Sequence, residues 1–128
     1  MVAWADYKSE AKSRGALALE LYVAQSTPAK APQDVKVSWP DHLAYQATLE
    51  AAGQLAFAGP MSDKTGDHMQ GMGLIIYRAD SLEAAQVLAE NDPMHLSGAS
   101  SFVLRRWMIN EGSLSLSVGL STKTVSLT

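Results

Sequence analysis

The sequence of 128 residues contains no cysteine, which excludes disulfide bonds, cysteine nucleophiles and thiolate metal ligands. No apolar run approaches the ~18 residues of a membrane span, and charged residues stand where a signal peptide would have an apolar core. A net charge of −3 lacks the positive excess that is typical of nucleic-acid or anionic-membrane binding. We therefore expect a cytoplasmic protein with no nucleic-acid and no membrane partner.

Apolar residues make up 47% of the chain, which predicts a folded protein and not a disordered one. The length fits one domain, and a domain of this size can fold without a metal or a disulfide bond. No motif in the chain implies a cofactor.

The first part of the chain predicts a helix, a strand and a loop. Apolar residues at helical spacing in residues 1–15 predict a short helix that ends at Gly15. Alternation over residues 16–23 predicts a strand, and the prolines and polar residues of 26–37 predict a loop.

A long helix is expected to begin near Pro40. Ser38 and Asp41 have capping-box spacing, and proline is tolerated in the first turn of a helix. The helix should run to about Ala52 and stop at Gly53.

The remaining pattern predicts a second half of similar order. The expected elements are a strand at 54–58 closed by Gly59 and Pro60, a loop at 61–71, a strand at 72–79, a helix at 82–90 with capping-box spacing between Asp80 and Glu83, a stop at Asn91, Asp92 and Pro93, a loop at 94–100 and a strand at 101–109. From Ser113 the chain alternates serine with leucine or valine, which predicts a half-buried edge strand.

This order predicts an α+β fold, a ferredoxin-like βαββαβ unit with both long helices on one face of the sheet. The expected division is a helical extension at 1–15, the domain at 16–112 and a β extension at 113–128.

The other sheet face would then lack a cover. It would carry Tyr22, Tyr77 and Trp107, or Phe102 and Met108 in the alternate register. An apolar face of this kind favours a second copy of the chain, in a two-fold dimer with a pocket between or beside the sheets. The aromatic residues Tyr22, Tyr77 and Trp107 are candidates for lining that pocket.

His42 and Asp92 are the candidate catalytic residues. His42 is expected in the first turn of its helix, where the helix dipole favours the neutral imidazole that a general base needs. Asp92 is expected at the C-terminal end of the other helix, where a carboxylate needs a partner. If the two side chains touch, the carboxylate would strengthen the base and hold one tautomer. The structural alternatives are a capping or surface histidine and a helix-stopping aspartate.

Other polar residues offer weaker candidates. His68 and His95 could join the pair around a metal, but their spacing matches no metal motif, so no metal ligand is assigned. Arg105 and Arg106 should point to opposite faces of their strand. Arg105 is assigned to an anionic group of the substrate, and surface salt bridging is the alternative.

Several short motifs resemble the YciI-like family, also called the YCII-related domain. They are Pro40-Asp41-His42-Leu43, the stretch Gly53–Pro60 that resembles the family's "G-x-L-x-x-A/S-G-P", Gly71-x-Gly73, the stretch Asp80–Ala85, Asp92-Pro93 and Gly98, which together cover about residues 16–110.

The resemblance implies a dimeric α+β barrel in which His42 and Asp92 occupy the family's proposed active site. Several reactions are known among the proteins that this chain resembles: one characterised branch of the family eliminates chloride from a chlorinated hydroxyquinol, and related barrels isomerise lactones or act on other aromatic-derived compounds.

Three hypotheses follow. The first is an enzyme, a dehydrochlorinase-like lyase or an isomerase, in which His42 and Asp92 perform elimination, isomerisation or hydrolysis on a small, aromatic-derived substrate. The second is a non-catalytic module that binds a small ligand or only oligomerises. The third is a metal-assisted enzyme.

Overall fold

The computed structural model describes residues 1–127 and divides into two units. One unit is Glu20–Trp107, and the other joins Met1–Leu19 to the residues from Met108 onward. In chain order the elements are α1 (Trp4–Ser13), β1 (Leu19–Pro28), α2 (Pro32–Ala51), β2 (Leu55–Ser62), β3 (Met69–Tyr77), α3 (Leu82–Glu90), α4 (Pro93–Leu96), β4 (Ser100–Ile109), β5 (Leu116–Val118) and β6 (Val125–Leu127).

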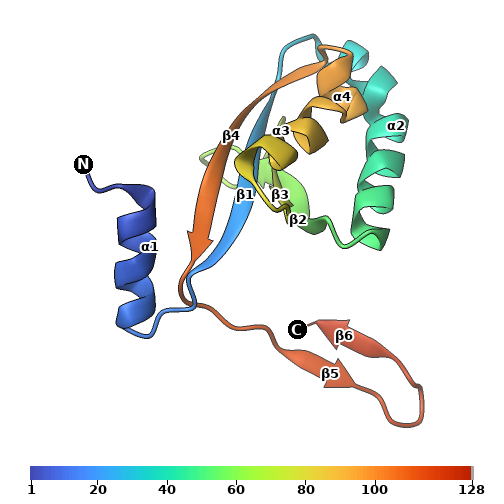
Figure 1. Cartoon of the computed structure of the whole chain (residues 1–128). Coiled ribbons are helices and arrows are strands. Elements are labelled where there is room, and N and C mark those ends of the chain that lie inside the picture. The colour runs from blue at the N-terminus through green and yellow to red at the C-terminus, as the bar shows by residue number, and fades with distance from the viewer. Residues whose placement is uncertain (128) are drawn as a thin grey trace. The chain divides into compact units, whose positions relative to one another are not determined.

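The first unit is built on a four-stranded sheet in the order β2-β3-β1-β4. β3 is antiparallel to both of its neighbours, and Tyr77 of β3 lies opposite Tyr22 of β1 and Leu55 of β2. The helices α2, α3 and α4 all lie on one side of this sheet (Figure 1). The predicted ferredoxin-like α+β fold is therefore confirmed.

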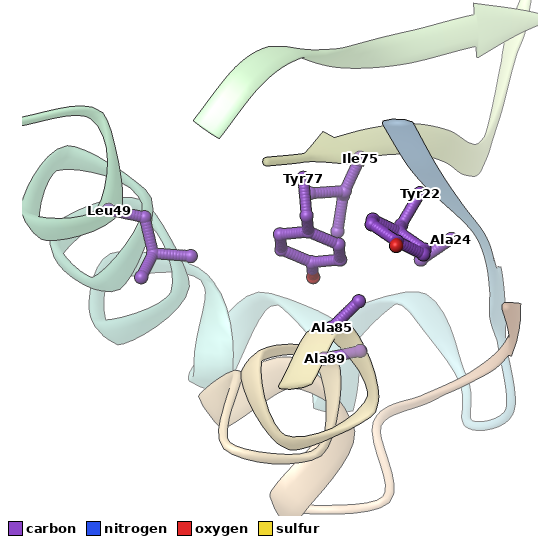
Figure 2. Close-up of a cluster of buried hydrophobic side chains, with 7 residues drawn as sticks. All are labelled: Tyr22, Ala24, Leu49, Ile75, Tyr77, Ala85 and Ala89. Carbon is purple, nitrogen blue, oxygen red and sulfur yellow. The ribbon is translucent and has the colours of Figure 1, made fainter. Parts of the chain in front are cut away.

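The main core lies between the sheet and these helices (Figure 2). Its buried members are Tyr22, Ala24, Leu49, Ile75, Tyr77, Ala85 and Ala89. The expectation that Tyr22 and Tyr77 share the uncovered face is wrong, since both rings pack beneath the helices. Strand alternation separates two sets of side chains, but it does not say which set a helix will cover.

The opposite face of the sheet carries no helix of the unit Glu20–Trp107. Phe102 and Leu104 of β4 pack against the core, so alternation places Val103, Arg105 and Trp107 on that opposite face. Val103 and Trp107 are 54% and 43% exposed.

The long helix begins earlier than expected. The predicted loop at 26–37 is wrong, because β1 runs to Pro28 and α2 begins at Pro32, with proline at its first positions and Asp34 in its first turn. Pro40 is therefore inside the helix. The expected end is correct: α2 stops at Ala51, and Gly53 has a φ of +75°, which glycine adopts without strain.

The strands β2 and β3 are both longer than predicted. β2 continues through Gly59 and Pro60, because it is an outer strand of the sheet, where a proline is tolerated. β3 begins at Met69, so the predicted loop at 61–71 is shorter than expected. Gly71 has a φ of +85°, and a Cβ atom there would lie 2.7 Å from Pro28 Cγ, so any other residue would be strained and would displace Pro28.

The helix α3 has the predicted bounds but a different cap. Ser81 accepts a hydrogen bond from the backbone N–H of Ala84 at 3.0 Å, in place of the expected Asp80. The predicted loop at 94–100 instead begins with a short helix, α4.

The second unit contains α1, β5 and β6. Ala11, Ala18 and Met108 form its buried cluster, and α1 is followed by Gly15 with a φ of +86°. The single strand expected from Ser113 is wrong, because β5 and β6 pair with each other and all their described residues are exposed. Within residues 1–127 no helix combines the length and the apolar character that crossing a membrane requires.

Candidate functional site

His42 lies in the middle of α2, not in its first turn, so the expected effect of the helix N-terminus does not apply. Helical spacing puts it on the same face as Tyr45 and Leu49, which pack against the core. The Tyr45 hydroxyl donates to the carbonyl of Leu88 at 2.8 Å and fastens α2 to α3. The His42 side chain remains 14% exposed.

Asp92 lies at the junction of α3 and α4. It follows the end of α3, as predicted, but it is also the N-cap of α4, where its Oδ1 accepts the backbone N–H of Met94 at 2.9 Å. An N-cap position is favourable for a carboxylate, so the start of α4 offsets the unfavourable end of α3 that the sequence predicts. Only 1% of the Asp92 side chain is exposed.

These two side chains meet. Nδ1 of His42 lies 2.8 Å from both Oδ1 and Oδ2 of Asp92. A carboxylate only accepts, so Nδ1 carries a proton and donates a hydrogen bond to Asp92, which leaves the lone pair of the neutral ring on Nε2. Nε2 in turn contacts the amide nitrogen of Gln46. An imidazole held in this way can act as a general base through Nε2.

Two phenols lie close to the carboxylate. Burial, reinforced by the negative charge of Asp92, raises the pKa of Tyr77 and of Tyr45 above the ordinary tyrosine value. The Tyr77 hydroxyl is buried and has no hydrogen-bond partner among residues 1–127. Both phenols therefore stay neutral beside Asp92 at ordinary pH.

A hollow of about 300 Å³ lies between α2 and β2. It is lined by Leu43, Gln46, Ala47, Glu50, Leu55, Ala56, Phe57 and Ala58. Gln46 is both in this lining and in contact with His42. The sequence prediction missed Gln46 and Glu50, although their positions one and two turns after His42 were a signal that could have found them.

The residues predicted to bind substrate are not gathered at this hollow. Tyr22 and Tyr77 are in the core, whereas Arg105 and Trp107 are on the opposite face of the sheet. Arg106 is on the helix-covered side, and its Nε lies 3.2 Å from Glu20 Oε1. The substrate-binding roles of these residues stay predictions.

The side chains of the other two histidines do not contact the pair. His68 is 79% exposed, with Nδ1 3.7 Å from Asp63 Oδ2. His95 donates from Nδ1 to the carbonyl of Ala89 at 2.7 Å, and its Nε2 accepts from the Ser26 hydroxyl at 2.8 Å. Across residues 1–127, no three His, Asp or Glu side chains gather in the way that a metal ion needs.

The chain matches the YCII-related domain over residues 19–108, and it therefore belongs to that family. Among its relatives is the uncharacterized protein YjpA of Bacillus subtilis (strain 168). The two are 33% identical over 70 residues, which are 55% of this chain and 75% of YjpA.

A similar solved structure is that of 5-chloro-2-hydroxyhydroquinone dehydrochlorinase (TftG) from Burkholderia phenoliruptrix AC1100, in complex with 2,5-dihydroxybenzoquinone. The TM-score is 0.50 at 22% identity, and the match covers 68% of this chain and 92% of TftG. This likeness establishes the shared fold.

Proposed function

We propose that the protein is an enzyme that uses His42 as a general base and acid on a small organic substrate, with Asp92 holding the imidazole. The observation that carries the proposal is the contact of His42 Nδ1 with both carboxylate oxygens of Asp92 at 2.8 Å. An oriented imidazole whose second nitrogen carries a lone pair is the arrangement that acid–base enzymes use.

The proton would move through Nε2. Nδ1–H stays bonded to Asp92 while Nε2 removes a proton from an acidic C–H or O–H of the substrate. In an elimination, the leaving group then departs with its bonding electrons. In an isomerisation, the imidazolium returns the proton to another atom. Asp92 stabilises the imidazolium in both cases without taking up a proton.

Elimination of a halide from a hydroxylated ring is the first reaction to test, because TftG, a dehydrochlorinase, shares the fold. Isomerisation and hydrolysis of small aromatic-derived compounds are the next. We propose that the reaction belongs to the domain at 16–112, with the segments 1–15 and 113–128 outside the site.

The experiment measures chloride release from 5-chloro-2-hydroxyhydroquinone, followed by a panel of hydroxylated rings and lactones. His42→Gln should lower the rate by about 10²–10⁴. His68→Gln makes the same change at an exposed histidine and should retain the rate. Circular dichroism must show that both variants are folded. A His42→Gln variant as active as the wild type would refute the proposal.

A non-catalytic role is the second candidate, favoured by one observation. The residues that line the hollow include Gln46 but neither His42 nor Asp92. In this alternative the pair only ties α2 to α4 around a ligand-binding or assembly module. Unchanged ligand affinity in His42→Gln, together with lost stability and no turnover of any panel compound by the wild type, would favour it.

We also propose that two copies of the chain associate through the sheet face opposite the helices. Phe57, Val103 and Trp107 are 56%, 54% and 43% exposed, and an apolar face of this kind usually has a partner. Phe57 lies opposite Ile76, which lies opposite Val23, so a row of apolar positions crosses the sheet.

A further inference from the structure

Gln46 lies one helical turn after His42 on α2 and contacts Nε2, the ring nitrogen that does not face Asp92. The amide nitrogen of Gln46 faces Nε2 of His42, while Nδ1 of the same ring faces Asp92 at 2.8 Å. Gln46 also lines the hollow between α2 and β2. Gln46 therefore contacts the nitrogen that would move a proton and is part of the lining of a hollow large enough for a small molecule.

The donor and the acceptor in this contact can be assigned. With the Nδ1 proton committed to Asp92, Nε2 carries a lone pair and accepts an N–H of the Gln46 amide. Once Nε2 takes up a proton, it becomes a donor and faces another donor. The contact can then persist only if the amide turns and presents its Oε1 to the new N–H.

We propose that Gln46 is a positioning residue for His42. It holds the Nε2 lone pair in the resting protein and turns its amide whenever that nitrogen is protonated. Its use in turnover rests on the proposed function, whereas its effect on the imidazole does not.

A ligand bound in the hollow would cause the Gln46 amide to turn. A ligand there meets the Gln46 amide, and a hydrogen bond to the ligand would draw the amide away from Nε2. Of the eight lining residues, Glu50 alone is charged. An uncharged ligand with hydroxyl groups suits such a lining better than a carboxylate or phosphate would, because Glu50 repels anions.

The surroundings of the imidazole allow a clean test. The titratable groups near it are Asp92 in direct contact and the phenols of Tyr45 and Tyr77, on which Asp92 acts. Substitution of Gln46 leaves all three in place. The side-chain nitrogens of the three histidines can be followed by ¹⁵N NMR across pH, with His42 assigned from the His42→Gln variant.

Gln46→Leu removes the amide that bonds both forms of the ring, and the bond from the imidazolium to Oε1 is the stronger one, so the proton affinity of His42 should fall about three- to tenfold. Gln46→Glu places a carboxylate at Nε2 and should raise it at least about tenfold. Gln86→Leu is the matched control, because Gln86 makes an i,i+4 contact with Glu90 on α3. It should leave the titration of His42 unchanged.

Two results would overturn the inference. One is a wild-type His42 with its proton on Nε2 at neutral pH. The other is a Gln46→Leu variant whose His42 titrates as in the wild type. Neither result depends on turnover, so they are distinct from a failure of the proposed function, which would appear as undiminished activity in His42→Gln.

Discussion

The carboxylate of Asp92 accepts a hydrogen bond from His42 Nδ1 at 2.8 Å. Its Oδ1 also accepts a hydrogen bond from the backbone N–H of Met94, the first N–H of α4, at 2.9 Å. The buried side chain of Asp92 thus joins the middle of α2 to the start of α4. The pair couples a local cap with a contact between residues fifty positions apart in the chain.

Asp92→Ala should be strongly destabilising, because it removes the cap and leaves the His42 N–H without its acceptor. The free energy of unfolding should fall by about 2–4 kcal/mol, measured by urea denaturation. Ser81→Ala removes only the cap of α3 and should cost about 1 kcal/mol. Equal losses in the two variants would mean that the contact with His42 adds nothing to stability.

Tyr77→Phe should stabilise the protein. It removes a buried hydroxyl that has no partner among residues 1–127, so the free energy of unfolding should rise by about 1 kcal/mol. Tyr45→Phe is the opposite case, since it removes a hydrogen bond of 2.8 Å to the carbonyl of Leu88. A loss of about 1 kcal/mol is expected there. The prediction is wrong if Tyr77→Phe lowers stability as much as Tyr45→Phe does.

Stability should decline at alkaline pH. Burial and the charge of Asp92 raise the pKa of Tyr77 and of Tyr45 in the folded state. Above the ordinary tyrosine pKa of ~10, the unfolded chain releases protons that the folded chain keeps. The contribution of the two phenols to the free energy of unfolding is therefore complete below that pH and is lost as the pH rises above it. Urea denaturation between about pH 8 and 11 should show this decline, and Tyr77→Phe should make it shallower. An unchanged slope in Tyr77→Phe would contradict the assignment to Tyr77.

Val103→Asp should disrupt the proposed dimer, because it places a charge on the sheet face opposite the helices. Val87→Asp is the control, on α3, at nearly equal exposure (53% against 54%). Sedimentation equilibrium should show a weakened self-association for Val103→Asp alone. The proposed interface is wrong if both variants associate as the wild type does.

The order of helices and strands could be predicted from the sequence because it depends on local patterns. The strands alternate, Gly53 follows the end of α2, and Ser81 caps α3 in a segment already predicted to start there. The start of α2 was misread because Pro32 and Pro40 carry the same local signal. Only the packing of the whole helix distinguishes a proline that starts it from one inside it.

The pair His42 and Asp92 could be named from the sequence, but its contact could not be predicted from spacing alone. A contact between residues fifty positions apart depends on how α2 lies against the α3–α4 junction. The positions of Tyr22 and Tyr77 were predicted wrongly for a related reason. Period-two alternation shows that Tyr22 and Ala24 share a face of the sheet, but whether this face is covered depends on where the helices pack.

Pro60 has a consequence for the behaviour of the protein at high concentration. β2 is the outermost strand on its side of the sheet, and within residues 1–127 it pairs with β3 alone. A proline there has no backbone N–H to offer to an incoming strand, so the exposed border is a poor template for edge-to-edge growth into aggregates. Pro60 thereby disfavours the growth of fibres through the β2 edge of the sheet.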